Sequence, residues 1–246
     1  MAIVTGAASG IGRAAALGLA HKGARLALLD RDERGLEETL DLVARRDITA
    51  SYRVDLGSGV ETAAAFDRAT NRFGRVDILV NGAGIVGAGA AFLDVTEETL
   101  EQVYAVNLRA PFILMKLAAR RMIAQGQGGR IVNVTSGAAH RARNSQAAYG
   151  SSKAALSQLT RTAAAELGRY DINVNAVAPG LTLTPLVAAR FDEGALAEAV
   201  REGPISNLLH RASMPEDIAN MIVFLCLPES RQVTAQTIHV SAGATV

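Results

Sequence analysis

Short apolar segments and longer alanine-rich segments alternate along nearly the whole chain. Short apolar strands separated by helices are typical of βαβ units. The pattern therefore predicts an α/β fold with a parallel, doubly wound sheet flanked by helices. The expected strands are Ala2–Thr5, Arg25–Leu29, Thr49–Val54, Val76–Val80, Arg130–Val134, Asn173–Val177 and Thr237–Val240, and the expected helices include Ile11–His21, Leu36–Arg45, Val60–Arg72, Leu108–Gln125 and Ala155–Leu167.

The chain contains no linker, repeat or low-complexity segment, so we expect one domain over residues 1–246. The glycine-rich segment Gly82–Gly89 is short and follows a predicted strand, which indicates a functional turn rather than a hinge. The segment from Pro179 to Pro204 interrupts the strand–helix pattern before the last helix and strand. It predicts a substrate lid at about residues 182–210.

Small aliphatic residues dominate the composition, with 49% apolar residues, 4% aromatic residues and no Trp. A core of Ala, Val, Ile and Leu suits a parallel sheet covered by closely packed helices. The net charge of +1 and the scattered arginines argue against a nucleic-acid partner. The one cysteine, Cys226, lies in an apolar run, so we expect a buried thiol and no disulfide framework.

The chain carries no pattern that is typical of a metal site or of a membrane protein. Its four histidines are far apart and lack the spacing of metal ligands. No apolar run reaches the ~18 residues of a membrane span. A glycine turn that begins at residue 6 leaves no room for a signal peptide. We therefore expect a cytoplasmic protein without a metal and without membrane contact.

A glycine-rich turn, Thr5-Gly6-Ala7-Ala8-Ser9-Gly10-Ile11-Gly12, joins the first predicted strand to the first predicted helix. Gly6 permits a tight turn, Gly10 lets the backbone approach a pyrophosphate, and Gly12 allows helix and sheet to pack closely. The helix N-terminus offers free N–H groups to phosphates. The spacing G-x-x-x-G-x-G differs from the usual G-x-G-x-x-G fingerprint, so a purely structural turn stays an alternative.

Asp30 ends the second predicted strand, eighteen residues after Gly12. A carboxylate at this place accepts hydrogen bonds from the adenosine ribose and repels a 2′-phosphate, which favours NAD over NADP. Arg31 could bind such a phosphate, but it can also point to solvent. The alternative for Asp30 is a helix N-cap of the next segment.

Tyr149 and Lys153 are four residues apart, which places them on one face of a helix, and Ser136 lies thirteen residues before Tyr149. A tyrosine titrates near pH ~10, and a fixed cation beside it favours the phenolate. Lowering its pKa by about three units requires roughly 4 kcal/mol, more than one exposed ion pair supplies. A second positive charge, such as an oxidised nicotinamide, would be needed. Two ordinary helix-face residues remain the alternative.

These motifs occur in the order seen in short-chain dehydrogenases/reductases, and the chain resembles that family from residue 3 to residue 243. The resemblance implies a single Rossmann-type doubly wound domain with a seven-stranded, mainly parallel sheet flanked by helices. The resemblance implies that Tyr149 acts as general base or acid and that Ser136 binds the substrate oxygen. It also implies that Lys153 binds the nicotinamide ribose and lowers the pKa of Tyr149. Asn107 would hold a water molecule of a proton relay, or would only cap backbone at a helix kink. The motifs are the glycine turn, Asp55-Leu56, Asn81-Gly82-Ala83-Gly84, Asn107, Ser136, Tyr149-x-x-x-Lys153 and Pro179-Gly180.

The resemblance further implies cofactor contacts at the adenine and nicotinamide ends. Asp55 and Leu56 would flank the adenine, and Asn81 and Ala83 would lie along the cofactor and the central strands. The nicotinamide would contact Pro179 and Gly180, with its carboxamide or the phosphates near Thr182 and Thr184. The complete expected set is Gly6, Ser9, Gly10, Ile11, Gly12, Asp30, Arg31, Asp55, Leu56, Asn81, Ala83, Tyr149, Lys153, Pro179, Gly180, Thr182 and Thr184.

The resemblance implies a homotetramer, or a homodimer, formed through the helices around residues 108–125 and 150–168. Three segments depart from the family's pattern. Asn81-Gly82 replaces Asn-Asn, Thr234-Ala235-Gln236 replaces Thr-Gly-Gln, and Ser241-Ala242-Gly243 replaces Asp-Gly-Gly. The last two lie where tetramer contacts form, so they bear on oligomer geometry and not on the chemistry.

The predicted function is an NAD-dependent oxidoreductase that transfers a hydride between a secondary alcohol, or its ketone, and the nicotinamide. One alternative is ketone reduction as in 3-oxoacyl-carrier-protein reductases. Another is a dihydrodiol carboxylate dehydrogenase, because Ala139-His140-Arg141 resembles that subgroup. Arg141 and Arg143 are then either solvated loop charges or contacts for an anionic substrate. A non-catalytic scaffold that binds the cofactor is the remaining alternative, and a P-loop is excluded because no Gly-Lys-Ser/Thr follows the glycine turn.

Overall fold

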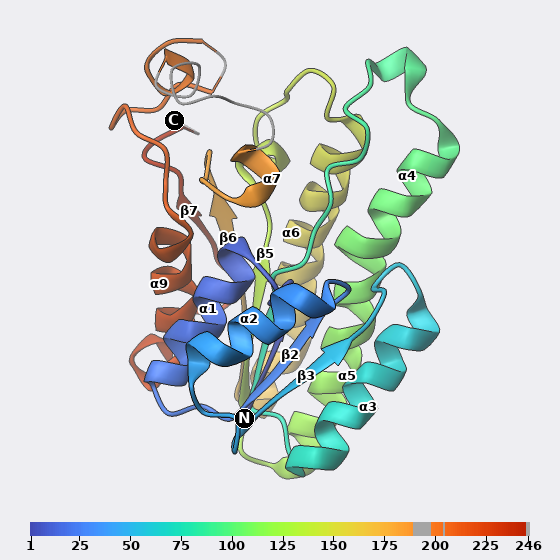
Figure 1. Cartoon of the computed structure of the whole chain (residues 1–246), viewed down its shortest axis with the longest axis vertical. Coiled ribbons are helices and arrows are strands. Elements are labelled where there is room, and N and C mark those ends of the chain that lie inside the picture. Colours follow the sequence, from blue (N-terminus) through green and yellow to red (C-terminus); the bar gives the residue numbers. More distant parts are fainter. Residues whose placement is uncertain (189–197, 204, 245–246) are drawn as a thin grey trace.

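The structure, a computed structural model, describes residues 1–188, 198–203 and 205–244. Seven parallel strands form one sheet in the order β3-β2-β1-β4-β5-β6-β7, with helices on both faces (Figure 1). This confirms the predicted doubly wound fold. The strands are β1 (Ala2–Thr5), β2 (Leu26–Asp30), β3 (Thr49–Arg53), β4 (Ile78–Asn81), β5 (Gly129–Val134), β6 (Ile172–Pro179) and β7 (Thr237–Val240).

Alternate residues of the central strands enter two separate cores, because successive side chains of a strand point to opposite faces of the sheet. Val4 and Leu28 pack with the cluster that contains α1 (Gly10–His21), α2 (Glu33–Val43) and α9 (Pro215–Cys226). Ile3 and Leu29 pack with the cluster that contains α3 (Gly59–Phe73), α5 (Ala110–Gln125) and α6 (Ala147–Leu167). Both faces are buried, as a parallel sheet requires.

Helix starts differ from the predictions where polar caps lie before the apolar pattern begins. Helix α2 begins at Glu33 instead of Leu36, because the Asp32 carboxylate accepts a hydrogen bond from the Gly35 N–H. Helix α6 begins at Ala147 instead of Ala155, so it carries both Tyr149 and Lys153. Helix α4 (Glu97–Tyr104) was not predicted, since it is short and Val103 is its one buried residue.

The predicted helix Leu108–Gln125 is in fact a π-helical turn, Ala105–Arg109, followed by α5. Pro111 stands in the first turn of α5 and has no N–H, so it cannot donate the usual helical hydrogen bond to the carbonyl of Asn107. Single π-helical turns inside helices recur at functional sites. This turn places Asn107, which is fully buried, between Ile85, which follows β4, and Ser152 of α6.

The carboxyl ends of β1 and β4 mark the point where the strand order reverses, and parallel sheets bind ligands at such points. Thr5 pairs in register with Asn81. The Thr5 hydroxyl accepts hydrogen bonds from the N–H groups of Gly82 (3.1 Å) and Ala83 (3.2 Å). A Cβ on Gly6 would come within 2.8 Å of the Ala83 nitrogen, so the two glycine turns touch.

The predicted lid at about 182–210 lies partly outside the described residues. In its described part, α7 (Pro185–Ala188) follows β6, and a short parallel bridge joins Thr182 to Ser213. A search of the described helices finds none whose length and apolar character would allow it to cross a membrane.

Candidate active site

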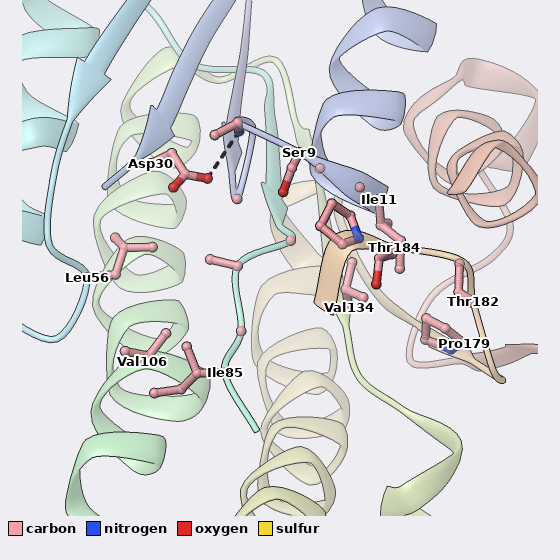
Figure 2. Close-up of a pocket in the computed structure, with 18 of the residues that line it drawn as sticks. Ser9, Ile11, Asp30, Leu56, Ile85, Val106, Val134, Pro179, Thr182 and Thr184 are labelled. Carbon is pink, nitrogen blue, oxygen red and sulfur yellow. Dashed lines mark hydrogen bonds between the residues drawn. The ribbon is translucent and has the colours of Figure 1, made fainter. Parts of the chain in front are cut away.

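A cavity of about 450 Å³ opens along the carboxyl edge of the sheet. Figure 2 shows Asp30 and Leu56 on one side of it and Pro179, Thr182 and Thr184 on the other. The cavity is therefore elongated across the strand ends, as a dinucleotide requires. The other lining residues are Gly6, Ala8, Ser9, Gly10, Ile11, Gly12, Arg31, Asp32, Val54, Asp55, Gly82, Ala83, Gly84, Ile85, Val106, Val134, Thr135, Ser136, Tyr149, Lys153, Gly180, Pro185 and Val187.

The glycine turn after β1 lines the cavity. Gly6 has φ +70°, and a Cβ on Gly12 would lie 2.1 Å from the Gly6 carbonyl oxygen. Neither position accepts a side chain, because the turn folds directly against the first turn of α1. The first N–H groups of a helix have no intrahelical partner, and residues 9–12 line the cavity, so these groups are available to an anionic ligand.

Asp30 is fixed by the backbone on both of its oxygens. The Ala8 N–H donates to its Oδ2 (3.1 Å), and the Asp32 N–H donates to its Oδ1 (3.1 Å) (Figure 2 shows the first bond). The N-cap of α2 is Asp32, so the alternative that Asp30 caps this helix is wrong. Asp30 instead holds its carboxylate at the cavity edge, beside Arg31.

Ser136, Tyr149 and Lys153 meet at the other end of the cavity, although they come from two elements. Ser136 follows β5 and is the N-cap of a single 3-10 turn, Gly137–Ala139, while Tyr149 and Lys153 lie in the first two turns of α6. Burial raises the pKa of the Tyr149 phenol, and its hydrogen bond with Ser136 opposes that rise. The phenol therefore needs a nearby positive charge before it can act as a base.

Lys153 is the cation that the fold brings to this place. Its side chain is 3% exposed, and its Nζ donates to the Val134 carbonyl at 2.8 Å. Nζ lies 5.9 Å from the centre of the Tyr149 ring. Burial lowers the pKa of Lys153 to about 8. The ammonium therefore still carries its charge at neutral pH, but at a cost in stability.

Asn107 does not line the cavity, and its side chain makes three hydrogen bonds behind it. Its Oδ1 accepts from the Ile85 N–H (2.9 Å), and its Nδ2 donates to the Ile85 carbonyl (2.8 Å) and to the Ser152 hydroxyl (3.1 Å). Asn107 therefore lies at an irregular turn between two helices, as the alternative of a helix-kink residue expected. Its side chain, however, binds the backbone of Ile85 and not the backbone of its own helix. The amide has no hydrogen left for a water molecule.

Of the residues predicted for the site, Asn81 and Asn107 alone are missing from the cavity wall. Asn81 is buried and donates to the Asn133 side chain at 2.8 Å, so it lies along the central strands, and its contact with a cofactor stays a prediction. The anion hypothesis for Arg141 and Arg143 gains no support, because neither lines the cavity. Arg141 donates to the Ala244 carbonyl instead.

The sequence analysis missed four apolar residues that line the cavity, Ile85, Val106, Val134 and Val187. Val134 could have been found, because it ends a strand at the same edge as the other site residues. Val187 follows β6 in a segment without a periodic pattern, so no comparable signal pointed to it. The described residues include no group of three or more His, Cys, Asp or Glu that could hold a metal ion.

The lowered pKa of Lys153 predicts a stability effect. Below about pH 8 the Lys153 ammonium is charged in the folded and in the unfolded protein, and only the folded protein carries the free-energy cost of removing it from water. Between the folded pKa and the ordinary value of 10.5 the unfolded chain binds more protons, so this penalty fades as pH rises. Lys153→Met should therefore stabilise the protein at pH 7 by roughly 2 kcal/mol, and this gain should shrink towards pH 10.

Calorimetric melting temperatures at pH 7 and pH 9.5 would check this. Lys116→Met, at an exposed position of α5, is the matched control and should leave the melting temperature almost unchanged. A Lys153→Met protein that melts below wild type at pH 7 would contradict the expected cost of burying this charge.

Comparisons with known proteins agree with this geometry. The family model described as enoyl-(acyl carrier protein) reductase matches residues 6–245. An uncharacterized oxidoreductase of Escherichia coli, YohF, is 36% identical over 99% of this chain and 94% of its own length. The solved acetoin dehydrogenase YohF from Salmonella typhimurium is 36% identical with a TM-score of 0.88, covering 99% of this chain and 94% of that one.

A 3-ketoacyl-(acyl-carrier-protein) reductase from Brucella melitensis, solved in complex with NADH, is 29% identical with a TM-score of 0.90. The match covers 100% of this chain and 98% of that one. Other relatives carry the family's name. A match over nearly the whole length, together with the shared fold, establishes that this chain belongs to the short-chain dehydrogenase/reductase family, oxidoreductases that bind nicotinamide cofactors and act on CH–OH groups.

Proposed function

We propose that the protein transfers a hydride between a secondary alcohol, or its ketone, and NAD, with Tyr149 as general base or acid. The observation that carries the proposal is the meeting of Ser136, Tyr149 and Lys153 at one end of a cavity whose centre is a dinucleotide-type glycine turn. One cavity thus contains a proton acceptor, Tyr149, and backbone N–H groups of the glycine turn that can bind phosphates.

The three side chains divide the acid–base work. The Ser136 hydroxyl, which is hydrogen-bonded to Tyr149, is placed to bind the substrate oxygen and hold it within reach of the phenol. The Lys153 ammonium favours the phenolate by its charge. When bound, an oxidised nicotinamide supplies the hydride acceptor and a second positive charge. Together the two cations oppose the rise in the Tyr149 pKa that burial causes.

We infer that the main-chain carbonyl of Asn107, and not its side chain, holds the water of the proton relay. The side-chain amide already uses both of its hydrogens and one lone pair of its oxygen on Ile85 and Ser152. Pro111 has no N–H and cannot donate the α-helical hydrogen bond to the Asn107 carbonyl. This carbonyl is therefore a natural acceptor for a water molecule that returns protons to Lys153.

We propose NAD rather than NADP as the coenzyme. The two backbone N–H groups that bind Asp30 fix its carboxylate at the adenosine end of the cavity, and Asp32 adds a second negative charge nearby. Both charges oppose a 2′-phosphate. The Brucella relative, which was solved with NADH, supports this choice.

We propose a small uncharged hydroxyketone or ketone as substrate. The lining of the cavity includes the apolar residues Ile85, Val106 and Val134, and Arg141 is bound to the C-terminal tail. This arrangement favours neutral substrates over dihydrodiol carboxylates, and the acetoin dehydrogenase of Salmonella supports it. A 3-oxoacyl-carrier-protein remains the second candidate, supported by the Brucella relative.

We also propose self-association through an apolar groove between α4, the π-helical turn, α5 and α6. Tyr104, Leu108, Phe112 and Leu159 line it, and Phe112 is 48% exposed. A groove of this kind on the two helices that the sequence marked for a homotetramer fits a second copy of the chain. The cytoplasmic location stays a prediction.

The base assignment predicts that Tyr149→Phe lowers turnover at least about a thousandfold, because the phenol's proton chemistry is lost. Reduction of 2,3-butanedione and oxidation of a panel of secondary alcohols would be followed by NADH absorbance. NADH binding, followed by its fluorescence, should stay within about twofold of wild type. Tyr170→Phe, at an exposed tyrosine, should retain full activity. A Tyr149→Phe enzyme with wild-type turnover would refute the assignment.

The coenzyme proposal predicts that Asp30→Ala reduces the preference for NAD⁺ over NADP⁺ by roughly 100-fold, which corresponds to about 2.7 kcal/mol. The measured quantity is the ratio of kcat/KM for the two coenzymes. Asp41→Ala, at an exposed acid of α2, controls for a general loss of negative charge and should keep the preference. An unchanged ratio in Asp30→Ala would rule out the repulsion argument.

The groove proposal predicts that Phe112→Asp yields smaller particles in light scattering coupled to size exclusion, because a charge in an apolar interface is costly. Phe92→Asp, at a phenylalanine outside the groove that is 79% exposed, should keep the wild-type mass. If Phe112→Asp also retains that mass, the contact between copies lies elsewhere.

A further inference from the structure

Ser152 is a fully buried serine that stands between Tyr149 and Lys153 in α6. Its hydroxyl donates to the Tyr149 carbonyl at 2.7 Å and accepts from the Asn107 amide at 3.1 Å. A hydroxyl has one hydrogen, so the first bond fixes the direction of its lone pairs towards Asn107. This side chain therefore connects the turn that carries the base and the cation to the π-helical turn.

The connection extends to the wall of the cavity. The Asn107 amide binds both backbone groups of Ile85, which lines the cavity after β4. A Cβ on Gly84 would lie 3.1 Å from the Lys153 Nζ and 3.3 Å from the Asn107 Oδ1, so these groups are in close contact. Each hydrogen of the Asn107 amide has one partner. Loss of the Ser152 hydroxyl would leave one of them without its protein partner at a fully buried position.

Two neighbouring serines of α6 lack this double role. Ser151 is exposed, and its hydroxyl donates to the carbonyls of Ala147 and Ala148 in its own helix. Ser157 is buried, and its hydroxyl donates to the Lys153 carbonyl at 3.0 Å. Ser157 thus makes the same kind of bond to the backbone of its own helix as Ser152 does, but without the bond to Asn107.

We propose that Ser152 is a positioning residue for the reaction, which fixes the Tyr149–Lys153 turn against Asn107 and the Gly84–Ile85 segment. The inference rests on the proposed function of Tyr149 and Lys153. Without the hydroxyl, α6 can shift relative to the π-helical turn, and the ammonium then stabilises the phenolate less well. Ser152 touches neither substrate nor cofactor, so the effect falls on the pKa of the phenol and on kcat, not on binding.

The test is Ser152→Ala, measured by the pH dependence of kcat for oxidation of acetoin by NAD⁺, or of the most active alcohol of the panel. The apparent pKa of the base should rise by about one unit, and kcat at pH 7 should fall about tenfold. KM for NAD⁺ should stay within about twofold. Ser152→Cys keeps the shape but hydrogen-bonds weakly, so its shift should lie between those of wild type and Ser152→Ala.

A second readout needs no substrate. Phenolate absorbance is titrated in the NAD⁺ complex, and subtraction of the Tyr149→Phe curve removes the other three of the four tyrosines. The Tyr149 transition should move to higher pH in Ser152→Ala. Circular dichroism confirms that each variant is folded, and Ser152→Cys replaces Ser152→Ala if the alanine variant does not fold.

Ser157→Ala and Ser151→Ala separate positioning from stability. Ser157→Ala should lower the melting temperature and leave the pH profile and the phenolate titration at their wild-type positions. If Ser152→Ala moves neither of these more than Ser157→Ala does, the positioning role is overturned. If Tyr149→Phe itself stays active, the proposed function fails first, so the two failures are distinguishable.

Discussion

The parallel register of β1, β4 and β5 is the constraint on which the site depends. Thr5 pairs with Asn81, and Asn81 pairs with Asn133, so three strands end at one level. The two glycine turns that follow β1 and β4 then meet edge to edge, and Thr5 binds the N–H groups of the second turn. Everything that lines the cavity is placed relative to this contact.

Catalysis and stability are opposed at Lys153. Its long side chain lies almost wholly inside the protein, where Nζ donates to the Val134 carbonyl and burial disfavours its charge. No nearby carboxylate compensates it among the described residues. A carboxylate there would stabilise the fold, but it would also cancel the field that the phenol needs. The fold therefore retains a destabilising cation because the proposed chemistry requires it.

Much of this architecture could be predicted from the sequence. The seven strands, the glycine turn and the Tyr149–Lys153 face follow from apolar periodicity and residue spacing, which are local signals. The hydrogen bond from Asn81 to Asn133 could not be predicted, because Asn133 comes from another strand, fifty-two residues away. The π-helical turn was also missed, because it depends on contacts between distant segments, which a single sequence does not display.

The π-helical turn has a consequence for how residue 107 responds to mutation. The acceptor that we assign to the relay belongs to the main chain, and Pro111 cannot donate an α-helical hydrogen bond to it. Every residue at position 107 possesses that carbonyl. Replacing the asparagine thus removes its hydrogen bonds to Ile85 but leaves the main-chain carbonyl in place. A loss of activity in such a variant would then mean that the π-helical turn had changed its conformation. Only an edit of the backbone itself, such as an ester in place of the peptide bond, would weaken the acceptor and leave the asparagine side chain unchanged.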